Sequence, residues 1–301
     1  MISTTADVGA DALGEVTVEA NPEDIARAVA GEWRAAGVNR VSLGVQSFDD
    51  EVLRWMHRSH DAAQVTTAVR ILNGEGIGQI SIDLIFALPN SVSRSWERDL
   101  ETALALEPGH LSLYGLTVEP HTPLGRWTER GRVSGAPDER YEAEYLEADR
   151  RLGEAGYEHY EVSNFARPGE RAVHNSAYWQ GVPYLGLGPS AHGFDGARRR
   201  WNARDYVRWL ALVEGGNDPI DGGELLGAAE QEAERVYLGL RTSDGLVATE
   251  AELARSAAWV AQGWARHEAG RLVLTPTGWL RLDALATDLM ARSESVEGGR
   301  V

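Results

Sequence analysis

Five polar residues of the chain lie within or directly after segments that read as strands, or on the helix that follows one. Carboxylates accept hydrogen bonds from hydroxyl and amino groups, a guanidinium holds a carboxylate, and a carboxamide both donates and accepts. Gathered at one opening, such groups would bind a small molecule. The alternative is that they are satisfied polar groups that tie strands to helices. The five residues are Glu19, Gln46, Arg58, Asp83 and Thr117.

Asp83 lies inside a long apolar run, where an ionised carboxylate costs free energy unless it is paired. Arg58 falls on the helix expected after the second strand and is the expected partner of this carboxylate.

Residues 172–194, AVHNSAYWQGVPYLGLGPSAHGF, concentrate histidines and aromatic side chains among glycines and prolines. The segment shows the periodicity of neither a helix nor a strand, so we expect irregular structure. The glycines within 188–193 indicate close approach of the backbone to another group, or a tight turn. On the residues alone, His174 reads as a hydrogen-bonded histidine in a buried loop, with Tyr178 and Trp179 filling core space.

The elements that must position the five polar residues alternate regularly over residues 15–120. A β-α-β-α-β order implies parallel strands joined by right-handed crossovers. No Gly-x-Gly-x-x-Gly follows any strand, so a dinucleotide-binding fold has no support. A barrel-like α/β sheet, with its chemistry at the carboxyl ends of the strands, fits better. We expect strands over 15–20, 40–48, 79–89 and 110–120, and helices over 21–37, 50–76 and 94–109.

The regular alternation of strands and helices ends after Pro120. We expect a polar loop over 120–140, a helix over 139–157, a strand over 159–166 and a helix over 202–216. The order of elements that follows is typical of a winged helix-turn-helix: two helices, a short hairpin and a last helix capped by Thr275. The predicted division is a large α/β domain over 1–222, a small winged-helix-like α+β domain over 223–292 and a disordered tail over 293–301.

The composition of the 301 residues is that of a globular protein, with 43% hydrophobic and 25% charged residues. The net charge of -17 makes the chain a poor general partner for nucleic acids or anionic membranes. Residues 249–262, with one Arg against two Glu, lack a basic recognition helix. Because the chain has no cysteine, it cannot form disulfides or hold a metal through thiolates. No secretory leader and no apolar run of about 20 residues occurs, so we expect a cytoplasmic location.

Several stretches resemble the radical SAM family of oxygen-independent coproporphyrinogen III oxidase-like proteins, and specifically its haem chaperone branch. The most specific are GVNRVSLGVQSF at 37–48 and the His-Asn-x-x-Tyr-Trp motif at 174–179. The resemblance follows the chain in order from Val16 to the C-terminal unit. The other stretches are VEANPED, SIDLIFALPNSVSRSWERDL and PGHLSLYGLTVEPHTPLGR.

The resemblance implies roles for residues already singled out. Glu19, Gln46, Arg58 and Asp83 match positions that bind S-adenosylmethionine in the family. Thr117 matches a further position at a strand end, near the adenosine. The resemblance thus names a ligand for the predicted pocket.

The His-Asn-x-x-Tyr-Trp motif is associated with haem binding in the chaperone branch. His174 is then a candidate ligand of the haem iron, because a neutral imidazole binds iron well and flanking rings offer flat apolar faces to a porphyrin. His192 is a weaker candidate. Three arginines at 198–200 are expected in a solvated hairpin, with contact to a porphyrin propionate as the lesser alternative. The motif residues are His174, Asn175, Tyr178 and Trp179.

The chain departs from the family in its first part. Family members carry Cys-x-x-x-Cys-x-x-Cys for a [4Fe-4S] cluster and a glycine-rich end of the next strand, and this chain has neither. We therefore expect a partial (β/α) barrel of radical SAM type that lacks its first two strands. Without a cluster no electron reaches the sulfonium and no 5′-deoxyadenosyl radical forms, so the chain as given is not expected to be competent for that chemistry. A truncated reading frame is the expected origin, and a naturally cluster-free relative is the alternative.

The resemblance implies a haem chaperone that binds haem and S-adenosylmethionine and delivers haem to acceptor proteins. One alternative is an oxygen-independent coproporphyrinogen III oxidase, which decarboxylates propionates to vinyls by a radical route. Another is a catalytically incompetent relative that keeps a binding fold. Expected partners are haem or another porphyrin and haem-accepting proteins. A homodimer and peripheral contact with membrane-bound acceptors are further options, and nucleic acid is not expected.

Overall fold

The computed structural model describes residues 14–119, 122–131 and 133–297. The chain forms two compact units that divide between Val173 and His174. We call the described residues up to Val173 the sheet unit and those from His174 onward the C-terminal unit. The domain boundary expected after residue 222 lies inside the C-terminal unit and stays a prediction. None of the described helices combines the length and the apolarity that a membrane span needs.

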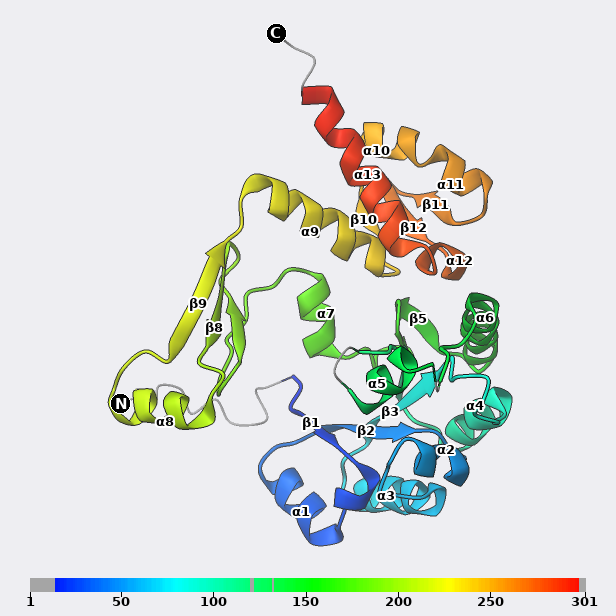
Figure 1. The fold of residues 1–301 in the computed structure, drawn as a ribbon, viewed down its shortest axis with the longest axis vertical. Helices are drawn as coiled ribbons and strands as arrows, with labels where there is room; N and C mark the ends of the chain where they lie inside the picture. Colours follow the sequence, from blue (N-terminus) through cyan, green and yellow to red (C-terminus); the bar gives the residue numbers. More distant parts are fainter. Residues whose placement is uncertain (1–13, 120–121, 132, 298–301) are drawn as a thin grey trace. The chain divides into compact units, whose positions relative to one another are not determined.

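The sheet unit contains one six-stranded sheet with the order β1-β2-β3-β4-β6-β5. Figure 1 labels its strands β1, β2, β3 and β5. Its first four strands are parallel, as expected from the β-α-β pattern, and the last two pair antiparallel. The single strand expected over 159–166 is a hairpin, because the chain turns at Val162 and Ser163. The sheet does not close, in agreement with a partial barrel. The strands are β1 (Thr17–Ala20), β2 (Arg40–Gln46), β3 (Gln79–Phe86), β4 (His110–Gly115), β5 (Glu158–Glu161) and β6 (Asn164–Ala166).

The helices of the sheet unit follow the expected order with three corrections. The helix expected over 21–37 is a short 3-10 turn followed by a separate helix, because Ile25 and Ala26 have extended backbone conformations. The helix expected over 50–76 is two helices, because His57 has a φ of 56° and Asp61 caps a new helix by accepting a hydrogen bond from the Gln64 N–H. The loop expected over 120–140 contains a short helix that Thr122 caps. The elements are η2 (Pro22–Asp24), α1 (Arg27–Ala35), α2 (Asp50–Trp55), α3 (Ala62–Gly74), α4 (Trp96–Ala105), α5 (Pro123–Glu129) and α6 (Asp138–Glu154).

Alternation of polar and apolar residues along β2, β4 and most of β3 gives the sheet one apolar and one largely polar face. On the apolar face Leu43, Ile82 and Leu111 are fully buried. The Phe86 ring lies 4.7 Å from the Tyr141 ring and within 6.0 Å of the rings of Trp96 and Tyr145, which places α4 and α6 on this face. The hydrophobic core therefore lies between the sheet and these helices, and the opposite face is left for polar side chains.

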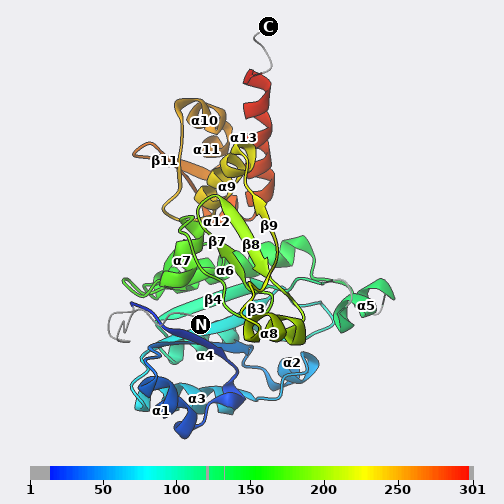
Figure 2. The same ribbon diagram turned by 90° about the vertical axis from the view of Figure 1, so that its left-hand side faces the viewer.

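The C-terminal unit begins with elements that the sequence did not reveal. Residues 172–194, expected to be irregular, contain a helix, α7 (Val173–Trp179), and a strand, β7 (His192–Phe194). The strand owes its conformation to antiparallel pairing with β8 (Arg198–Asn202), a tertiary contact that local periodicity does not report. β9 (Ile220–Leu225) completes this sheet, which Figures 1 and 2 show as a narrow ribbon with α8 (Tyr206–Glu214) at one end.

The remainder of the C-terminal unit has the element order of a winged helix-turn-helix, as expected. A sheet with the order β10-β12-β11 is accompanied by five helices among the described residues. The last helix runs to Glu297, whereas the tail was expected from residue 293, and residues 298–301 lie outside the described part. The elements are α9 (Ala228–Arg241), β10 (Leu246–Val247), α10 (Glu250–Arg255), α11 (Ala257–Ala261), β11 (Ala265–Glu268), β12 (Arg271–Leu274), α12 (Pro276–Trp279) and α13 (Leu282–Glu297).

Candidate functional site

Asp83 lies at the centre of the polar face of the sheet. Its carboxylate accepts hydrogen bonds from the Ser42 hydroxyl at 3.0 and 3.1 Å and from the Ser81 hydroxyl at 3.3 Å. Burial raises the pKa of Asp83, while the hydroxyls of Ser112, Ser42 and Ser81 oppose that rise. The expected pairing with Arg58 is wrong: hydroxyls on the neighbouring strands satisfy the carboxylate, and the nearby cation is Arg40.

Arg58 instead belongs to a cluster at the carboxyl ends of β1 and β2. It lies in the connection between α2 and α3, and its Nη1 donates to Asn21 Oδ1 at 3.3 Å. Gln46 ends β2 with a φ of 68°, a conformation that non-glycine residues rarely adopt. A Cβ atom at Gly44 would lie 2.9 Å from Gln46 Nε2 and 3.3 Å from Asn21 Oδ1. The two carboxamides thus occupy space that exists only because residue 44 is glycine.

Glu19 faces the same side of the sheet as Asp83. It is exposed on β1, in register with Ser42 of β2. Burial first, and then the negative charge of Asp83, raises the pKa of Tyr114, and Glu19 adds to this rise. The charges of Asp83 and Glu19 therefore both reach the Tyr114 hydroxyl. Thr117 lies beyond the end of β4, and its hydroxyl donates to the Gly115 carbonyl at 3.4 Å, so no described contact joins it to the other four.

A buried network next to Asp83 escaped the sequence analysis. His110 Nδ1 lies 2.8 Å from Ser81 Oγ, and His110 Nε2 lies 2.8 Å from the Tyr160 hydroxyl. Burial, and to a smaller extent the charge of Arg40, lowers the pKa of His110 to about 3, so this imidazole is neutral. The signal that could have found it is the alternation of polar and apolar residues in His-Leu-Ser-Leu-Tyr.

A second missed network fixes the chain directly after Gln46. The Asp99 carboxylate accepts hydrogen bonds from the Ser47 hydroxyl at 2.9 Å, the Phe48 N–H at 2.7 Å and Arg94 Nη1 at 3.0 Å. Arg94 Nη2 also pairs with Glu144 at 2.7 Å. Because both Asp99 and the Arg94 side chain are buried, this network holds the end of β2 in a single geometry.

The polar face fits the chemistry of S-adenosylmethionine. Two buried atoms of the polar face, Thr17 Oγ1 and Asn164 Oδ1, have no hydrogen-bond partner within the described residues. Carboxylates, carboxamides and a guanidinium match the amino, carboxylate and hydroxyl groups of this ligand. A [4Fe-4S] cluster does not fit, because the chain has no cysteine and no three described His, Asp or Glu side chains converge as metal ligands.

The motif of His174 lies on α7 in the C-terminal unit. His174 is exposed, so its interpretation as a histidine in a buried loop is wrong. Its ring meets that of Tyr178 edge-on at 4.8 Å between centroids, and Tyr178 meets Tyr184 in the same way at 4.6 Å. The Arg241 guanidinium lies 4.3 Å over the ring of Trp179, whose buried Nε1 has no hydrogen-bond partner in the described chain. Asn175 on the same helix is half-buried.

Two cavities adjoin this aromatic cluster. The first, of about 290 Å³, is lined by Tyr178 and Trp179 of α7 and by Leu238 of α9. The second, of about 360 Å³, lies against β7, β8 and β9. Tyr184 and Phe194 line both cavities, so the two are neighbours. Aromatic walls with a few polar groups are typical of small-molecule sites.

Comparisons with known proteins identify the family of the chain. The family model of the Radical SAM superfamily matches residues 4–103. The heme chaperone HemW of Mycobacterium tuberculosis is 36% identical over 279 residues, which cover 92% of this chain and 72% of that protein. HemW of Bacillus subtilis is 37% identical over 235 residues, 78% of this chain and 62% of that protein.

A solved structure shares the fold. Coproporphyrinogen III oxidase (HemN) from Escherichia coli, a radical SAM enzyme, matches with a TM-score of 0.73 and 20% identity, over 94% of this chain and 70% of that one. At this identity the likeness concerns the fold alone.

Proposed function

Because the chain belongs to the HemW family of radical SAM proteins, we propose that it binds haem on α7 and S-adenosylmethionine on the polar face of the sheet, and that it passes haem to acceptor proteins. Haem is the cargo in this proposal, and its acceptors are proteins. The expected cytoplasmic location, the homodimer and the contact with membrane-bound acceptors stay predictions.

The observation that carries the haem proposal is the arrangement of α7. It presents an exposed imidazole, His174, one turn before an aromatic ring, Tyr178, that lines a cavity. An imidazole that is open to solvent can reach an iron that arrives from solution. The ring of Tyr178 then offers an apolar surface beside that imidazole.

S-adenosylmethionine would be held by the residues of the polar face. Arg58 suits its carboxylate, Glu19 and Asp83 suit its amino and ribose groups, and the Gln46 carboxamide suits either kind of group. The ligand supplies a sulfonium centre when bound. Asp83, whose pKa is raised by burial, would accept further hydrogen bonds from a donor group of the ligand.

The second candidate function is the oxidative decarboxylation of coproporphyrinogen III, and the fold shared with HemN favours it. This reaction depends on a radical that a [4Fe-4S] cluster helps to generate, and the chain supplies no thiolate for such a cluster. The relatives with 36% and 37% identity carry the chaperone name instead. The chaperone function is therefore the better supported of the two.

An absorbance titration of the full chain with haem tests the proposal. We expect saturable binding, and we expect His174→Ala to weaken it by about tenfold or more and to shift the Soret band, because an iron ligand is lost. His267→Ala is the matched control, since His267 lies in the same unit on β11, where its Nε2 is 2.9 Å from Ser256 Oγ, and lines neither cavity. Equal affinity of the wild type and His174→Ala would remove His174 from the proposal.

A further inference from the structure

One face of the β7-β8-β9 sheet carries two arginines of β8, and glycines flank one of them on the neighbouring strands. In the antiparallel register, Arg200 of β8 lies between Gly193 of β7 and Gly223 of β9. A Cβ atom at Gly193 would lie 3.6 Å from Arg200 Nε, so the Arg200 side chain lies over the backbone of Gly193. Arg198, two residues earlier, lies on the same face, because side chains alternate along a strand.

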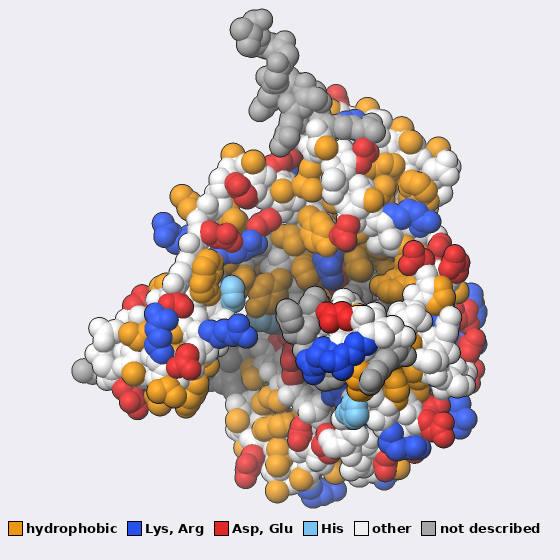
Figure 3. All heavy atoms as spheres, viewed as in Figure 1, with side chains coloured by type: hydrophobic (Ala, Val, Ile, Leu, Met, Phe, Trp, Pro, Cys, Tyr) orange, Lys and Arg blue, Asp and Glu red, His pale blue; other side chains and the backbone are white. Residues whose placement is uncertain are grey.

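The guanidinium groups of Arg198 and Arg200 are unpaired. Across the described residues, neither group donates a hydrogen bond or forms an ion pair. Nearby arginines do pair: Arg199 bonds Glu234 at 2.6 Å, and Arg208 bonds Asp221 at 2.6 Å. Arg198 and Arg200 are thus two exposed cations on one strand that form no ion pair within the described residues. Figure 3 shows the usual pattern, with acidic and basic side chains interspersed.

The acidic residue nearest these arginines is already engaged elsewhere. The Asp195 carboxylate accepts hydrogen bonds from the backbone N–H groups of Ala197 at 3.0 Å and Arg198 at 2.7 Å. These bonds, with smaller contributions from the charges of Arg198 and Arg200, lower the pKa of Asp195. Asp195 therefore shapes the hairpin turn and leaves the two guanidinium groups available to another anion.

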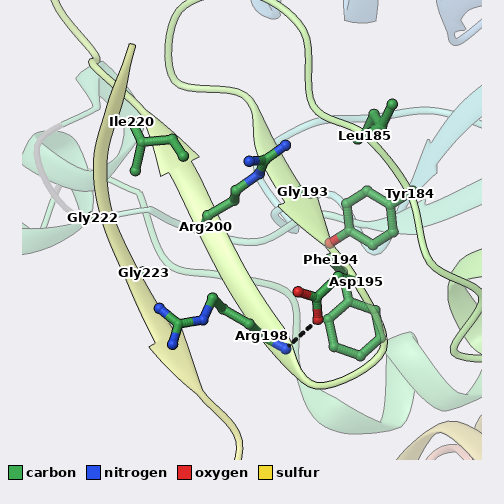
Figure 4. Close-up of a pocket in the computed structure, with 10 residues that line it drawn as sticks. All are labelled: Tyr184, Leu185, Gly193, Phe194, Asp195, Arg198, Arg200, Ile220, Gly222 and Gly223. Carbon is green, nitrogen blue, oxygen red and sulfur yellow. Dashed lines mark hydrogen bonds between the residues drawn. The ribbon is translucent and has the colours of Figure 1, made fainter. Parts of the chain in front are cut away.

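Both arginines line the cavity of about 360 Å³ (Figure 4). In this view the guanidinium of Arg200 extends toward β7 and that of Arg198 toward β9. Tyr184 and Phe194 form the wall that this cavity shares with the cavity beside α7. Cationic groups thus lie at one end of a continuous aromatic lining that reaches Tyr178 and, through it, the His174 ring.

We propose that Arg198 and Arg200 bind the two propionate carboxylates of the tetrapyrrole, while Tyr184 and Phe194 lie against its ring. This inference rests on the proposed function, haem binding. Guanidinium groups bind carboxylates through paired, charge-assisted hydrogen bonds. Gly193 and Gly223 leave room for the Arg200 side chain to lie across the neighbouring strands, so that it lines the cavity.

The experiment compares ligands that differ only in their carboxylates or in the iron. Haem, haem dimethyl ester, metal-free protoporphyrin and its dimethyl ester are titrated into the full chain and into Arg198→Gln/Arg200→Gln. We expect the wild type to bind the free acids at least about tenfold more tightly than the esters. The double variant should lose this preference, with weaker binding of the acids and unchanged binding of the esters.

Two control variants separate this inference from the proposed function. Arg204→Gln removes an exposed arginine in the same unit and should keep the preference for the acids. His174→Ala should weaken the binding of haem but not that of protoporphyrin, which has no iron. Near-UV circular dichroism establishes that each variant keeps its fold.

The possible outcomes of these titrations distinguish the role of the two arginines from haem binding itself. A preference for the acids that disappears only in Arg198→Gln/Arg200→Gln supports the inference. Haem binding without such a preference, or a preference that survives the double substitution, overturns the inference and leaves haem binding intact. Failure of the wild type to bind any of the four ligands removes the proposed function, and the inference falls with it.

Discussion

At the scale of single residues, Asp83 and Asp99 are two carboxylates in different environments. Burial raises the pKa of both. Asp99 has Arg94 and the Phe48 N–H as partners, whereas the described hydrogen bonds of Asp83 come from serine hydroxyls. The ionised form of Asp83 is therefore kept at a cost in stability, which is expected of a carboxylate that serves a ligand.

Asparagine at these two positions should have opposite effects on stability. Asp83→Asn should raise the free energy of unfolding at pH 7.5 by about 1 kcal/mol, because a buried charge is removed, and should weaken S-adenosylmethionine binding by about tenfold. Asp99→Asn should lower the free energy of unfolding by about 3 kcal/mol, because the buried Arg94 loses one of its two carboxylate partners. Urea unfolding and calorimetric titration measure these effects. Destabilisation by both substitutions would contradict a binding role for Asp83.

His110 predicts a pH dependence of stability. Burial lowers its pKa from the ordinary value of 6.5, which the unfolded chain keeps, to about 3 in the folded protein. As the pH falls below 6.5, the unfolded chain takes up a proton that the folded chain does not, so the free energy of unfolding decreases. Between pH 6.5 and 5 this loss is about 1.6 kcal/mol.

His110→Asn should therefore show a smaller loss of stability over this pH range than the wild type, even if it is less stable at every pH. Urea unfolding at pH 6.5 and pH 5.0 gives the comparison. His57→Asn is the control, because His57 is exposed and asparagine tolerates its φ of 56°. Parallel profiles of His110→Asn and the wild type would show that the histidine is not held neutral.

At the scale of elements, the sequence predicted what local patterns encode. The four parallel strands were found because branched apolar residues recur along them, and the residues at or near their ends led to Glu19, Gln46 and Asp83. The β5–β6 hairpin and the helix α7 were missed, the first because the strands around its turn are very short. The strand β7 depends on a partner along the chain, which periodicity cannot show.

The same limit explains what was missed in the candidate site. Asn21 was not among the candidate site residues, yet its side chain accepts a hydrogen bond from Arg58 and lies beside Gly44. Such a contact depends on the register of β1 with β2 and on the path of the connection after α2. Neither this register nor the path of the connection can be predicted from residue type and spacing.

The junction of β2 with η2 yields a prediction about Gly44. Gly44→Ala should displace the Gln46 carboxamide, which would lie 2.9 Å from the new Cβ atom, while the backbone needs little adjustment. We expect a loss of stability of about 1 kcal/mol or less and a loss of about tenfold in affinity for S-adenosylmethionine. Gly78→Ala is the matched control, because no atom lies within 4 Å of a Cβ atom there. Unchanged affinity in Gly44→Ala would remove Gln46 from the binding site.

At the scale of the whole molecule, the two proposed ligands belong to different units of the chain. Every residue assigned to S-adenosylmethionine precedes Val173, and every residue assigned to haem or its propionates follows it. A ligand stabilises the structure that it binds and suppresses the opening of the hydrogen bonds there. The division of the chain therefore predicts where each ligand protects the backbone.

Hydrogen–deuterium exchange of the full chain, read by peptide mass spectrometry, should separate the two footprints. Haem should slow exchange in peptides of α7, β7 and β8, where its proposed contacts lie, and this protection should shrink in His174→Ala. S-adenosylmethionine should slow exchange around the ends of β1 and β2, and this protection should shrink in Gly44→Ala but not in Gly78→Ala. Haem protection confined to β1 and β2 would mean that the cargo occupies the polar face of the sheet instead, and α7 would then lose its assigned role.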